Sequence, residues 1–448
     1  MTAPRSDGAS SALDSRLHEL ARRAAPPAVL GRLSEVVGLV LEARGCRAGI
    51  GDLWELQPDH GPAVEAEVVG LRGERTLLMP LGPTAGLEVG TPLRRLGRGA
   101  RAKVGAELLG RVVDALGRPL DGGPMPSLPH ERALDGGAPR NPLRRRPVDE
   151  PFPVGVRAID GLLTLGVGQR IGIFAGGGVG KSSLLGMMIR RARADVAVVA
   201  LIGERGREVE EFVHRTLGAE GLARAVVVAA TSAETPLLRA RGALYATTVA
   251  EHFRDQGLRV LLVMDSVTRY AMALREIGLA VGEPPTTKGY TPTVFAQLPR
   301  LLERAGTAEG PGAITGVYTV LVEGDDLSDP VSDAARAILD GHVVLSRELA
   351  ERGHFPAIDP AASVSRCMPQ VVSPDRIRVA QRARELIAHH REANELRAIG
   401  AYTPGTSPAL DDALTRWPAL ETFLRQRLDE HDDLDTTPAR LAAIWRTG

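Results

Sequence analysis

Residues 175–182 read Ala-Gly-Gly-Gly-Val-Gly-Lys-Ser and constrain the fold more than any other part of the chain. They follow directly on the apolar run Ile-Gly-Ile-Phe at 171–174, and residues 183–193 have the composition of a helix. A strand, a glycine-rich turn and a helix in succession bring backbone N–H groups and the positive end of a helix dipole to one point. The arrangement is typical of a loop that binds phosphate groups, and it favours an α/β fold around it.

The loop predicts a site for ATP and Mg²⁺. Lys181 should reach the β- and γ-phosphates, while the Ser182 hydroxyl should coordinate the magnesium ion. The first position is Ala175 rather than glycine, and a side chain this small should still allow the turn. The expected nucleotide contacts are Gly176, Gly177, Gly178, Val179, Gly180, Lys181, Ser182 and Ser183.

Lysine is scarce in this chain, which adds weight to the loop. The sequence has 55 lysines and arginines, and only Lys103, Lys181 and Lys288 are lysine. Arginine therefore supplies positive charge almost everywhere. At Lys181 a compact ammonium on a flexible stem fits a phosphate cradle that a planar guanidinium would crowd.

Between about 150 and 369, apolar strand-like runs alternate with helical stretches, which predicts a parallel sheet with helices on both faces. The expected strands are 170–175, 196–202, 225–230, 260–265 and 313–321. Asp265 ends one of these runs, at the carboxyl edge of the sheet, where it can hold Mg²⁺ through water. Glu204 closely follows the run 196–202 and should lie at the same edge, as the carboxylate that orients water for hydrolysis.

Composition excludes several classes of protein. The 55 acidic residues balance the 55 basic ones, so no basic field favours a nucleic-acid partner. Seven Phe, five Tyr and three Trp are too few to suggest a base-stacking platform. Two cysteines cannot form a disulfide framework, no apolar run approaches the roughly 20 residues of a membrane span, and the first residues lack a secretory signal. We therefore expect a cytoplasmic protein of several domains.

Four segments are expected. Residues 1–27 form an N-terminal helical segment, in which Leu13, Leu17, Leu20 and Ala24 share one face; it either packs on its own domain or docks a partner. Residues 28–97 contain short strand-like runs at 38–41, 64–71 and 76–79, which predict a small barrel or sandwich, and we favour the barrel. Residues 98–370 form the P-loop ATPase domain. Residues 371–448 form a small helical domain, with helices expected at 376–396 and 410–428.

Several longer stretches resemble one known family. They are FAGGGVGKSSLLGMM (174–188), IGERGREV (202–209), VMDSVTRYAMALREIG (263–278), GEPPTTKGYTPTVFAQLPRLLERAG (282–306) and ILDGHVVLSRELAERGHFPAID (338–359). At these residues the sequence resembles the protein-export ATPases of bacterial type III secretion, and its nucleotide-site pattern is similar to that of rotary ATP synthase catalytic and noncatalytic subunits. The resemblance implies a RecA-like ATPase core between the barrel and the helical domain.

The resemblance also implies roles for individual residues. Glu204 matches the catalytic carboxylate of the family, and Arg205 a contact to the γ-phosphate within the same subunit. Phe355 matches an aromatic that stacks on adenine, with packing in the core as the alternative. Arg366 matches an arginine finger supplied to the neighbouring subunit, which would make a ring necessary for activity. Residues 360–362 are smaller here than is usual for the family, which affects the local packing of Arg366.

By resemblance, the chain is a Mg²⁺-dependent ATPase that forms a homo-hexamer. The implied partners are export substrates and their chaperones, regulatory, stator and stalk proteins, and a membrane-embedded export gate, so the protein would be cytoplasmic and peripheral to the inner membrane. The segment 36–43 resembles the flagellar form more than the injectisome form. We favour a flagellar system and keep the injectisome as the alternative.

Three other functions compete with this interpretation. A hexameric RNA translocase would need an aromatic, basic first domain, yet residues 28–97 contain only Trp54 as an aromatic. A noncatalytic ring subunit would bind ATP without hydrolysing it, and Glu204 argues against that. A rotary ATP synthase subunit is disfavoured by the export-type stretch at 282–306.

Overall fold

The computed structural model describes residues 30–97, 99–137, 141–322, 329–433 and 436–446. The chain forms two compact units, Met1–Ala100 and Arg101–Gly448. The predicted N-terminal helical segment, residues 1–27, lies outside the described residues. The predicted domain limits at 97 and 370 stay predictions.

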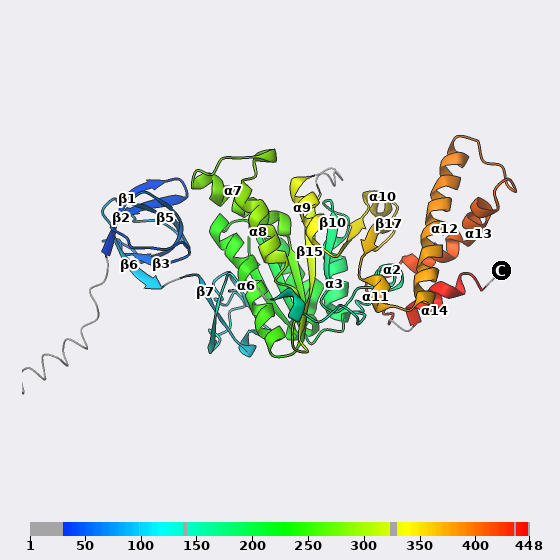
Figure 1. Ribbon diagram of the computed structural model, residues 1–448, viewed down its shortest axis with the longest axis horizontal. Helices are drawn as coiled ribbons and strands as arrows, with labels where there is room; N and C mark the ends of the chain where they lie inside the picture. Colours follow the sequence, from blue (N-terminus) through cyan, green and yellow to red (C-terminus); the bar gives the residue numbers. More distant parts are fainter. Residues whose placement is uncertain (1–29, 98, 138–140, 323–328, 434–435, 447–448) are drawn as a thin grey trace, which may run out of the picture. The chain divides into compact units, whose positions relative to one another are not determined.

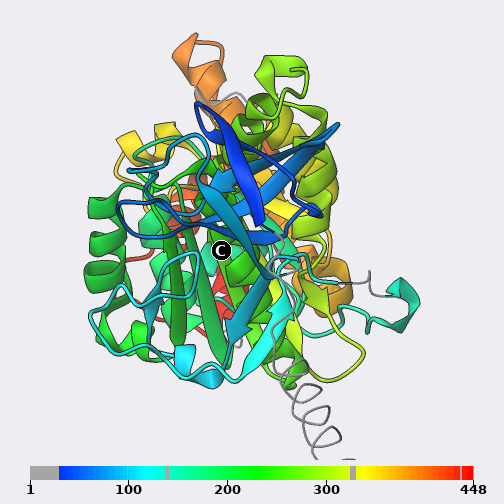
Figure 2. The same cartoon turned by 90° about the vertical axis from the view of Figure 1, so that its left-hand side faces the viewer.

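The first unit contains a closed six-stranded antiparallel barrel (Figure 2, blue). Its strands, in barrel order, are β1 (Leu30–Val37), β2 (Val40–Arg44), β5 (Arg75–Pro80), β4 (Val64–Arg72), β3 (Leu53–Leu56) and β6 (Pro92–Gly97). Trp54, fully buried, packs at its centre with aliphatic side chains from the other strands. Closure leaves no unpaired strand edge in the barrel.

One strand of the barrel differs from expectation. The run 38–41 was predicted as a strand, but Gly38 and Leu39 form the turn between β1 and β2. Gly38 has a φ of +59°, in the left-handed region that glycine enters at little cost. The prediction took an apolar residue as a sign of a buried strand, but Leu39 is exposed in the turn. Apolar character alone therefore does not distinguish a turn from a strand here.

The second unit is built on a mostly parallel sheet. In spatial order its strands are β17 (Ile358–Ser365), β16 (Gly341–Leu345), β10 (Arg170–Ala175), β15 (Ala313–Leu321), β13 (Arg259–Asp265), β11 (Val196–Ile202), β12 (Ala225–Ala230) and β8 (Val112–Val113), with β14 (Gly306–Thr307) paired to β15. The five strands predicted for this region are all present. β17 runs antiparallel to β16 at one edge, and β7 (Arg101–Val104) pairs with β9 (His130–Ala133) in a separate ribbon.

Helices cover the sheet. They are α2 (Arg157–Leu162), α3 (Lys181–Arg191), α4 (Gly206–Glu211), α5 (Gly218–Ala223), α6 (Pro236–Asp255), α7 (Val267–Ala280), α8 (Pro292–Leu302), α9 (Pro330–Ile338), α10 (Arg347–Glu351) and α11 (Met368–Val371), with short turns η1 (Ala106–Leu108), η2 (Pro142–Arg144), η4 (Thr287–Gly289) and a π-helical η3 (Phe212–Leu217). Leu184 and Met188 of α3 join the same apolar cluster as Ile173 and Val199 of the sheet, while α6 packs against β11, β12 and β13. Side chains of a strand alternate between faces, so strands buried on both sides read as continuous apolar runs.

Three helices end the chain, drawn in orange to red in Figure 1: α12 (Pro374–Ala398), α13 (Pro408–Leu424) and α14 (Thr436–Ala443). The prediction of a helix over 410–428 was wrong at its end, because α13 stops at Leu424. The carbonyls of Phe423 and Arg425 accept hydrogen bonds from the Arg157 guanidinium, and so are engaged outside the helix. Among the described residues, no helix combines the length and apolar character needed to cross a membrane.

Candidate active site

The glycine-rich loop joins β10 to α3 at the carboxyl edge of the sheet. Gly180 is the residue before the helix and has a φ of +90°, a conformation that residues with a side chain rarely adopt. No side chain hydrogen-bonds to the first turn of α3 as a cap. The helix N-terminus therefore presents its backbone N–H groups and its positive dipole to the space above the loop, as an anion site requires.

Two predicted residues meet directly across the sheet. The Lys181 ammonium donates a hydrogen bond to the Asp265 carboxylate, with Nζ 2.6 Å from Oδ1. The Thr319 hydroxyl, on the strand between β10 and β13, donates to the same oxygen at 2.6 Å. Asp265 is almost fully buried, so this pair of donors compensates a carboxylate removed from water.

Glu204 approaches the same lysine from β11. It follows Gly203 at the end of that strand, and its Oε1 lies 3.6 Å from the Lys181 ammonium. Burial raises the pKa of Glu204 to about 7, and Asp265 and Glu208 add to the increase while Lys181 opposes it. Within the described residues, Glu204 Oε1 is buried without a hydrogen-bond partner. The atom is thus available to accept a proton from a molecule in the cavity.

These side chains line one cavity of about 390 Å³. The predicted residues that line it are Gly176, Gly177, Gly178, Gly180, Lys181, Ser182, Ser183, Glu204, Arg205 and Asp265. Val179 is also in the loop, but its side chain is buried, so only its backbone can face a ligand. The Arg205 side chain is largely exposed, with its guanidinium 3.5 Å from Glu208.

Phe355 lies beside this cavity, between α10 and β17. Its ring carbons lie 3.5 Å from the point where a Cβ on Gly180 would stand, and about half of the residue is exposed. An exposed ring next to the phosphate-binding loop is available for a planar ligand to pack on. The alternative, that Phe355 packs in the core, does not fit a residue of which about half is exposed.

Arg366 is not part of the cavity. It follows β17, and its backbone N–H donates to the Asp340 carbonyl just before β16 begins. Since β17 runs antiparallel to β16, Arg366 lies at the amino ends of the parallel strands, whereas the loop follows their carboxyl ends. A strand of six residues such as β10 spans about 20 Å, so the two edges are separated by roughly that distance.

Comparison with known proteins identifies the family. Residues 155–365 match the nucleotide-binding domain of the ATP synthase alpha/beta family, residues 33–97 its beta-barrel domain, and residues 372–443 the T3SS EscN ATPase C-terminal domain. The chain is 53% identical over 433 residues to the "Flagellum-specific ATP synthase" of Pseudomonas aeruginosa, covering 95% of each chain. It belongs to the flagellar and type III secretion ATPases.

Other relatives agree. The "Type 3 secretion system ATPase" of Xanthomonas euvesicatoria is 49% identical over 92% of this chain and 93% of its own. The assembled ATPase EscN from the enteropathogenic E. coli type III secretion system superimposes with a TM-score of 0.87 and 46% identity, over 92% of this chain and 99% of that one. The predicted fold class, a P-loop ATPase core preceded by a β-barrel and followed by helices, is confirmed, and the chain is an ATPase of this family.

The site of this export ATPase includes residues that sequence reasoning missed. Arg269 lies in the first turn of α7 and lines the cavity, and its Nε is buried without a partner among the described residues. Glu208 and Ser232 also line it. Arg269 is part of the stretch 263–278, but an apolar run ending in aspartate singles out only Asp265. The sequence did offer one signal: Arg269 belongs to the helix that starts two residues after Asp265, which places it at the same edge of the sheet.

The donor set suits Mg²⁺ held jointly with phosphates. No group of three or more His, Cys, Asp or Glu side chains within the described residues could hold a metal ion by itself. Magnesium in nucleotide sites is held by one or two protein oxygens, several waters and the phosphates of the substrate. The Ser182 hydroxyl and the Asp265 carboxylate line the same cavity and provide that small set.

Proposed function

We propose that this chain binds ATP with Mg²⁺ in the cavity above the glycine-rich loop and hydrolyses it to energise type III protein export. The observation that carries the proposal is the convergence of Lys181, Asp265 and Glu204 at the end of that loop, with Nζ to carboxylate distances of 2.6 and 3.6 Å. The two carboxylates have different environments, because Asp265 accepts two hydrogen bonds whereas Glu204 Oε1 accepts none within the described residues.

The residues divide the chemistry. Lys181 exchanges its contact with Asp265 for the β- and γ-phosphates, and the loop backbone holds the remaining phosphate oxygens. Glu204 orients a water molecule toward the γ-phosphorus and accepts its proton, for which a pKa near neutrality is suited. Arg205, exposed at the mouth of the cavity, contacts the γ-phosphate, and the exposed ring of Phe355 stacks on adenine.

Ser182 and Asp265, which line the same cavity, are the residues that would hold Mg²⁺. The ion, when bound, neutralises charge on the β- and γ-phosphates. Release of the Lys181 ammonium to the nucleotide leaves the Asp265 carboxylate free for this role, while Thr319 keeps it oriented.

Activity depends on a homo-hexameric ring in which Arg366 acts on the neighbouring subunit. Arg366 lies at the sheet edge opposite to its own phosphate loop, so it cannot reach the nucleotide that its own chain binds. A second copy can present its Arg366 to that nucleotide. The proposal is supported by similarity to EscN, which has been described as assembled and in complex with its central stalk EscO.

We further propose that the ring works at the cytoplasmic face of the inner membrane, against the export gate, with substrates, chaperones, regulatory, stator and stalk proteins as partners. The flagellar system is favoured over the injectisome by the segment 36–43. The relatives bear both kinds of name, flagellum-specific in P. aeruginosa and type 3 secretion in X. euvesicatoria.

Two variants test the site. Lys181→Ala should lose nucleotide affinity and turnover together, because the phosphate contact disappears. Glu204→Gln should retain ATP binding but lose hydrolysis by roughly two orders of magnitude or more, the usual size of a general-base contribution. Phosphate release and equilibrium binding, measured on the folded full-length chain, separate the two effects. Substantial turnover in either variant would refute the assignment.

A cellular measurement tests the export system. Deletion of the gene in its own host should abolish swimming motility, and the wild-type gene but not the Glu204→Gln gene should restore it. Normal motility combined with loss of an injectisome secretion product would replace the flagellar assignment by its alternative.

A further inference from the structure

We propose that Arg157 is a positioning residue for the base-binding side of the nucleotide site. It acts through the connector, which we define as residues 425–432, the segment between α13 and α14. This inference rests on the proposed role of Phe355 in stacking on adenine.

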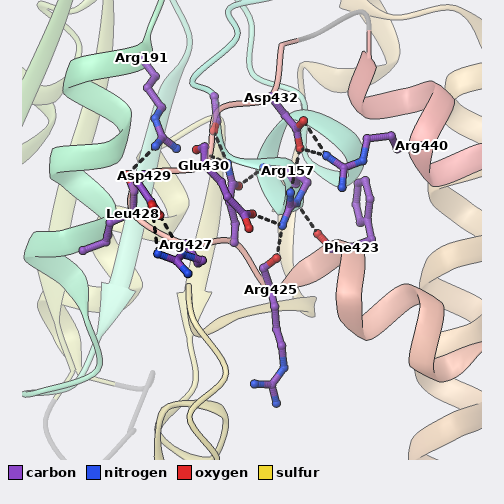
Figure 3. A network of polar contacts seen from close by, with 12 residues as sticks. Arg157, Arg191, Phe423, Arg425, Arg427, Leu428, Asp429, Glu430, Asp432 and Arg440 are labelled. Carbon is purple, nitrogen blue, oxygen red and sulfur yellow. Dashed lines mark hydrogen bonds and ion pairs between the residues drawn. The ribbon is translucent and has the colours of Figure 1, made fainter.

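Arg157 is a buried arginine, and all three nitrogens of its guanidinium donate hydrogen bonds to one segment that is distant in the sequence. Figure 3 shows it surrounded by the end of α13 and the connector. Its Nε donates to the Phe423 carbonyl at 2.8 Å, and its Nη1 to Asp432 at 3.0 Å. Its Nη2 donates to the Arg425 carbonyl and, at 2.8 Å, to Glu430. Because the fork binds two carbonyls and two carboxylates at once, it fixes the path of the chain leaving α13.

The connector in turn holds the backbone of Phe355. The Gln426 backbone N–H donates to the Phe355 carbonyl at 2.9 Å, and the Arg425 guanidinium donates to the Gly353 carbonyl at 3.1 Å. The Gln426 side chain is buried and bridges the connector to the start of α2, accepting from the Arg157 N–H at 2.8 Å and donating to the Gly155 carbonyl at 2.9 Å. The loop that carries the exposed ring is therefore tied to the residues that Arg157 anchors.

The same connector touches the helix that begins at the phosphate loop. Arg191, the last residue of α3, donates to the Leu428 carbonyl at 2.5 Å. The connector thus joins three segments: the far end of α3, the Phe355 loop and the start of α2. A hydrogen-bonded network with a charged centre is rigid, so the distance between the phosphate loop and the Phe355 ring is set by it.

This arrangement predicts a selective effect on the base. Loosening the connector should move Phe355 while the Lys181 contacts stay in place. Affinity for a nucleotide should fall, whereas affinity for a phosphate chain without a base should not. A merely structural role of Arg157 would weaken both ligands together.

The test compares binding of Mg²⁺-ADP and Mg²⁺-pyrophosphate to the full-length chain by calorimetry. Phe355→Ala should weaken ADP roughly tenfold through lost stacking and leave pyrophosphate unchanged. Arg157→Lys, which keeps the charge but loses the fork, should weaken ADP several-fold and also leave pyrophosphate unchanged. The double variant should bind ADP no more weakly than Phe355→Ala alone, since both changes remove one interaction.

Arg427→Gln is the matched control. Its guanidinium lies on the connector but pairs only with Asp429 of the same segment, as far as the described residues go, so ADP affinity should not change. If Arg157→Lys does not fold, as judged by circular dichroism, Glu430→Gln replaces it, because that half-exposed partner can be changed with the arginine in place.

The outcomes separate the two proposals. Equal affinity of wild type and Phe355→Ala for ADP would refute the role of Phe355. A normal loss in Phe355→Ala, with an unchanged ADP-to-pyrophosphate ratio in Arg157→Lys or Glu430→Gln, would refute positioning by Arg157 alone. Additive losses in the double variant would refute it as well.

Discussion

At the scale of single residues, Glu204 carries the clearest chemical signature. Its carboxyl group is mostly buried, and that burial raises its pKa from an ordinary value near 4.5 to about 7. The neighbouring Glu208 has its pKa lowered, mainly by the hydrogen bond that it shares with Glu204. The pKa values of the two carboxyl groups therefore shift in opposite directions, a pattern typical of sites that perform acid–base chemistry.

The pH dependence of turnover follows from this pKa. Glu204 works as a base only when deprotonated, so kcat/KM for ATP should be constant above about pH 7 and fall below it by about tenfold per pH unit. The measurement is kcat/KM between pH 5.5 and 8.5 at saturating Mg²⁺, with folding checked at each pH. The residual activity of Glu204→Gln should lack this limb. A wild-type profile that stays flat down to pH 5.5 would contradict the raised pKa of Glu204.

At the scale of elements, the start of α2 packs on the end of α3 at a glycine. Gly155 has a φ of +71°, and a Cβ there would lie 2.6 Å from the Arg191 Cβ. The backbone conformation and the space available both exclude a side chain. This contact lets the connector reach α2 and α3 together.

Gly155→Ala should therefore lower the free energy of unfolding by more than the backbone effect alone. The conformational cost of a left-handed alanine is about 1 kcal/mol, and the steric conflict with α3 should raise the total to about 2–4 kcal/mol. Gly400→Ala is the control, because Gly400 has a similar φ of +69° with no atom within 4 Å of the added methyl group. Urea unfolding followed by circular dichroism compares them. Equal shifts would contradict the packing argument.

The sequence predicted elements well where burial alone decides them. The strands at 170–175 and 196–202 coincide with β10 and β11, because strands covered on both faces read as apolar runs. The end of α13 was mispredicted because Leu428 continues the apolar pattern beyond it. In the structure Leu428 is exposed, and the chain leaves the helix to bind Arg157.

The residues around the site also divide into those that a local sequence pattern reveals and those that it does not. Lys181, Ser182 and Asp265 are recognisable because each lies at a fixed offset from a strand end or a glycine loop. The roles of Arg157 and Gln426 depend on a contact between residues 269 positions apart, which no local pattern encodes. Arg269 is intermediate. The stretch that contains it is recognisable from the sequence, but its contact with the cavity depends on the position of α7 in the fold.

At the scale of the whole molecule, the two halves of the proposed active site lie at opposite edges of one sheet. Lys181 follows the carboxyl end of β10, and Arg366 lies near the amino ends of β10 and β16. A subunit that has lost one half should therefore complement a subunit that has lost the other.

Mixing experiments test this complementation. Lys181→Ala and Arg366→Ala should each be inactive alone, with Arg366→Ala still binding ATP. An equal mixture should form rings in which roughly a quarter of the interfaces join an intact loop to an intact arginine finger, and ATP turnover should return to a comparable fraction. The control mixes Lys181→Ala with Lys181→Ala,Arg366→Ala, which has no intact interface. A mixture that stays inactive although fluorescence transfer reports subunit exchange would contradict the role in trans.

The connector has a thermodynamic consequence that works in both directions. If the helices α12–α14 and the nucleotide are coupled through Arg157, a protein that binds these helices more tightly in the ADP state must raise the affinity of the chain for ADP. This happens through slower loss of ADP or faster capture of it. ADP must in turn raise the affinity of the chain for that protein by the same factor. A partner bound to these helices would then regulate nucleotide exchange without touching the phosphate loop. Arg157, which anchors the end of α13 and the connector, would then also link binding at the last helices to the exchange of nucleotide.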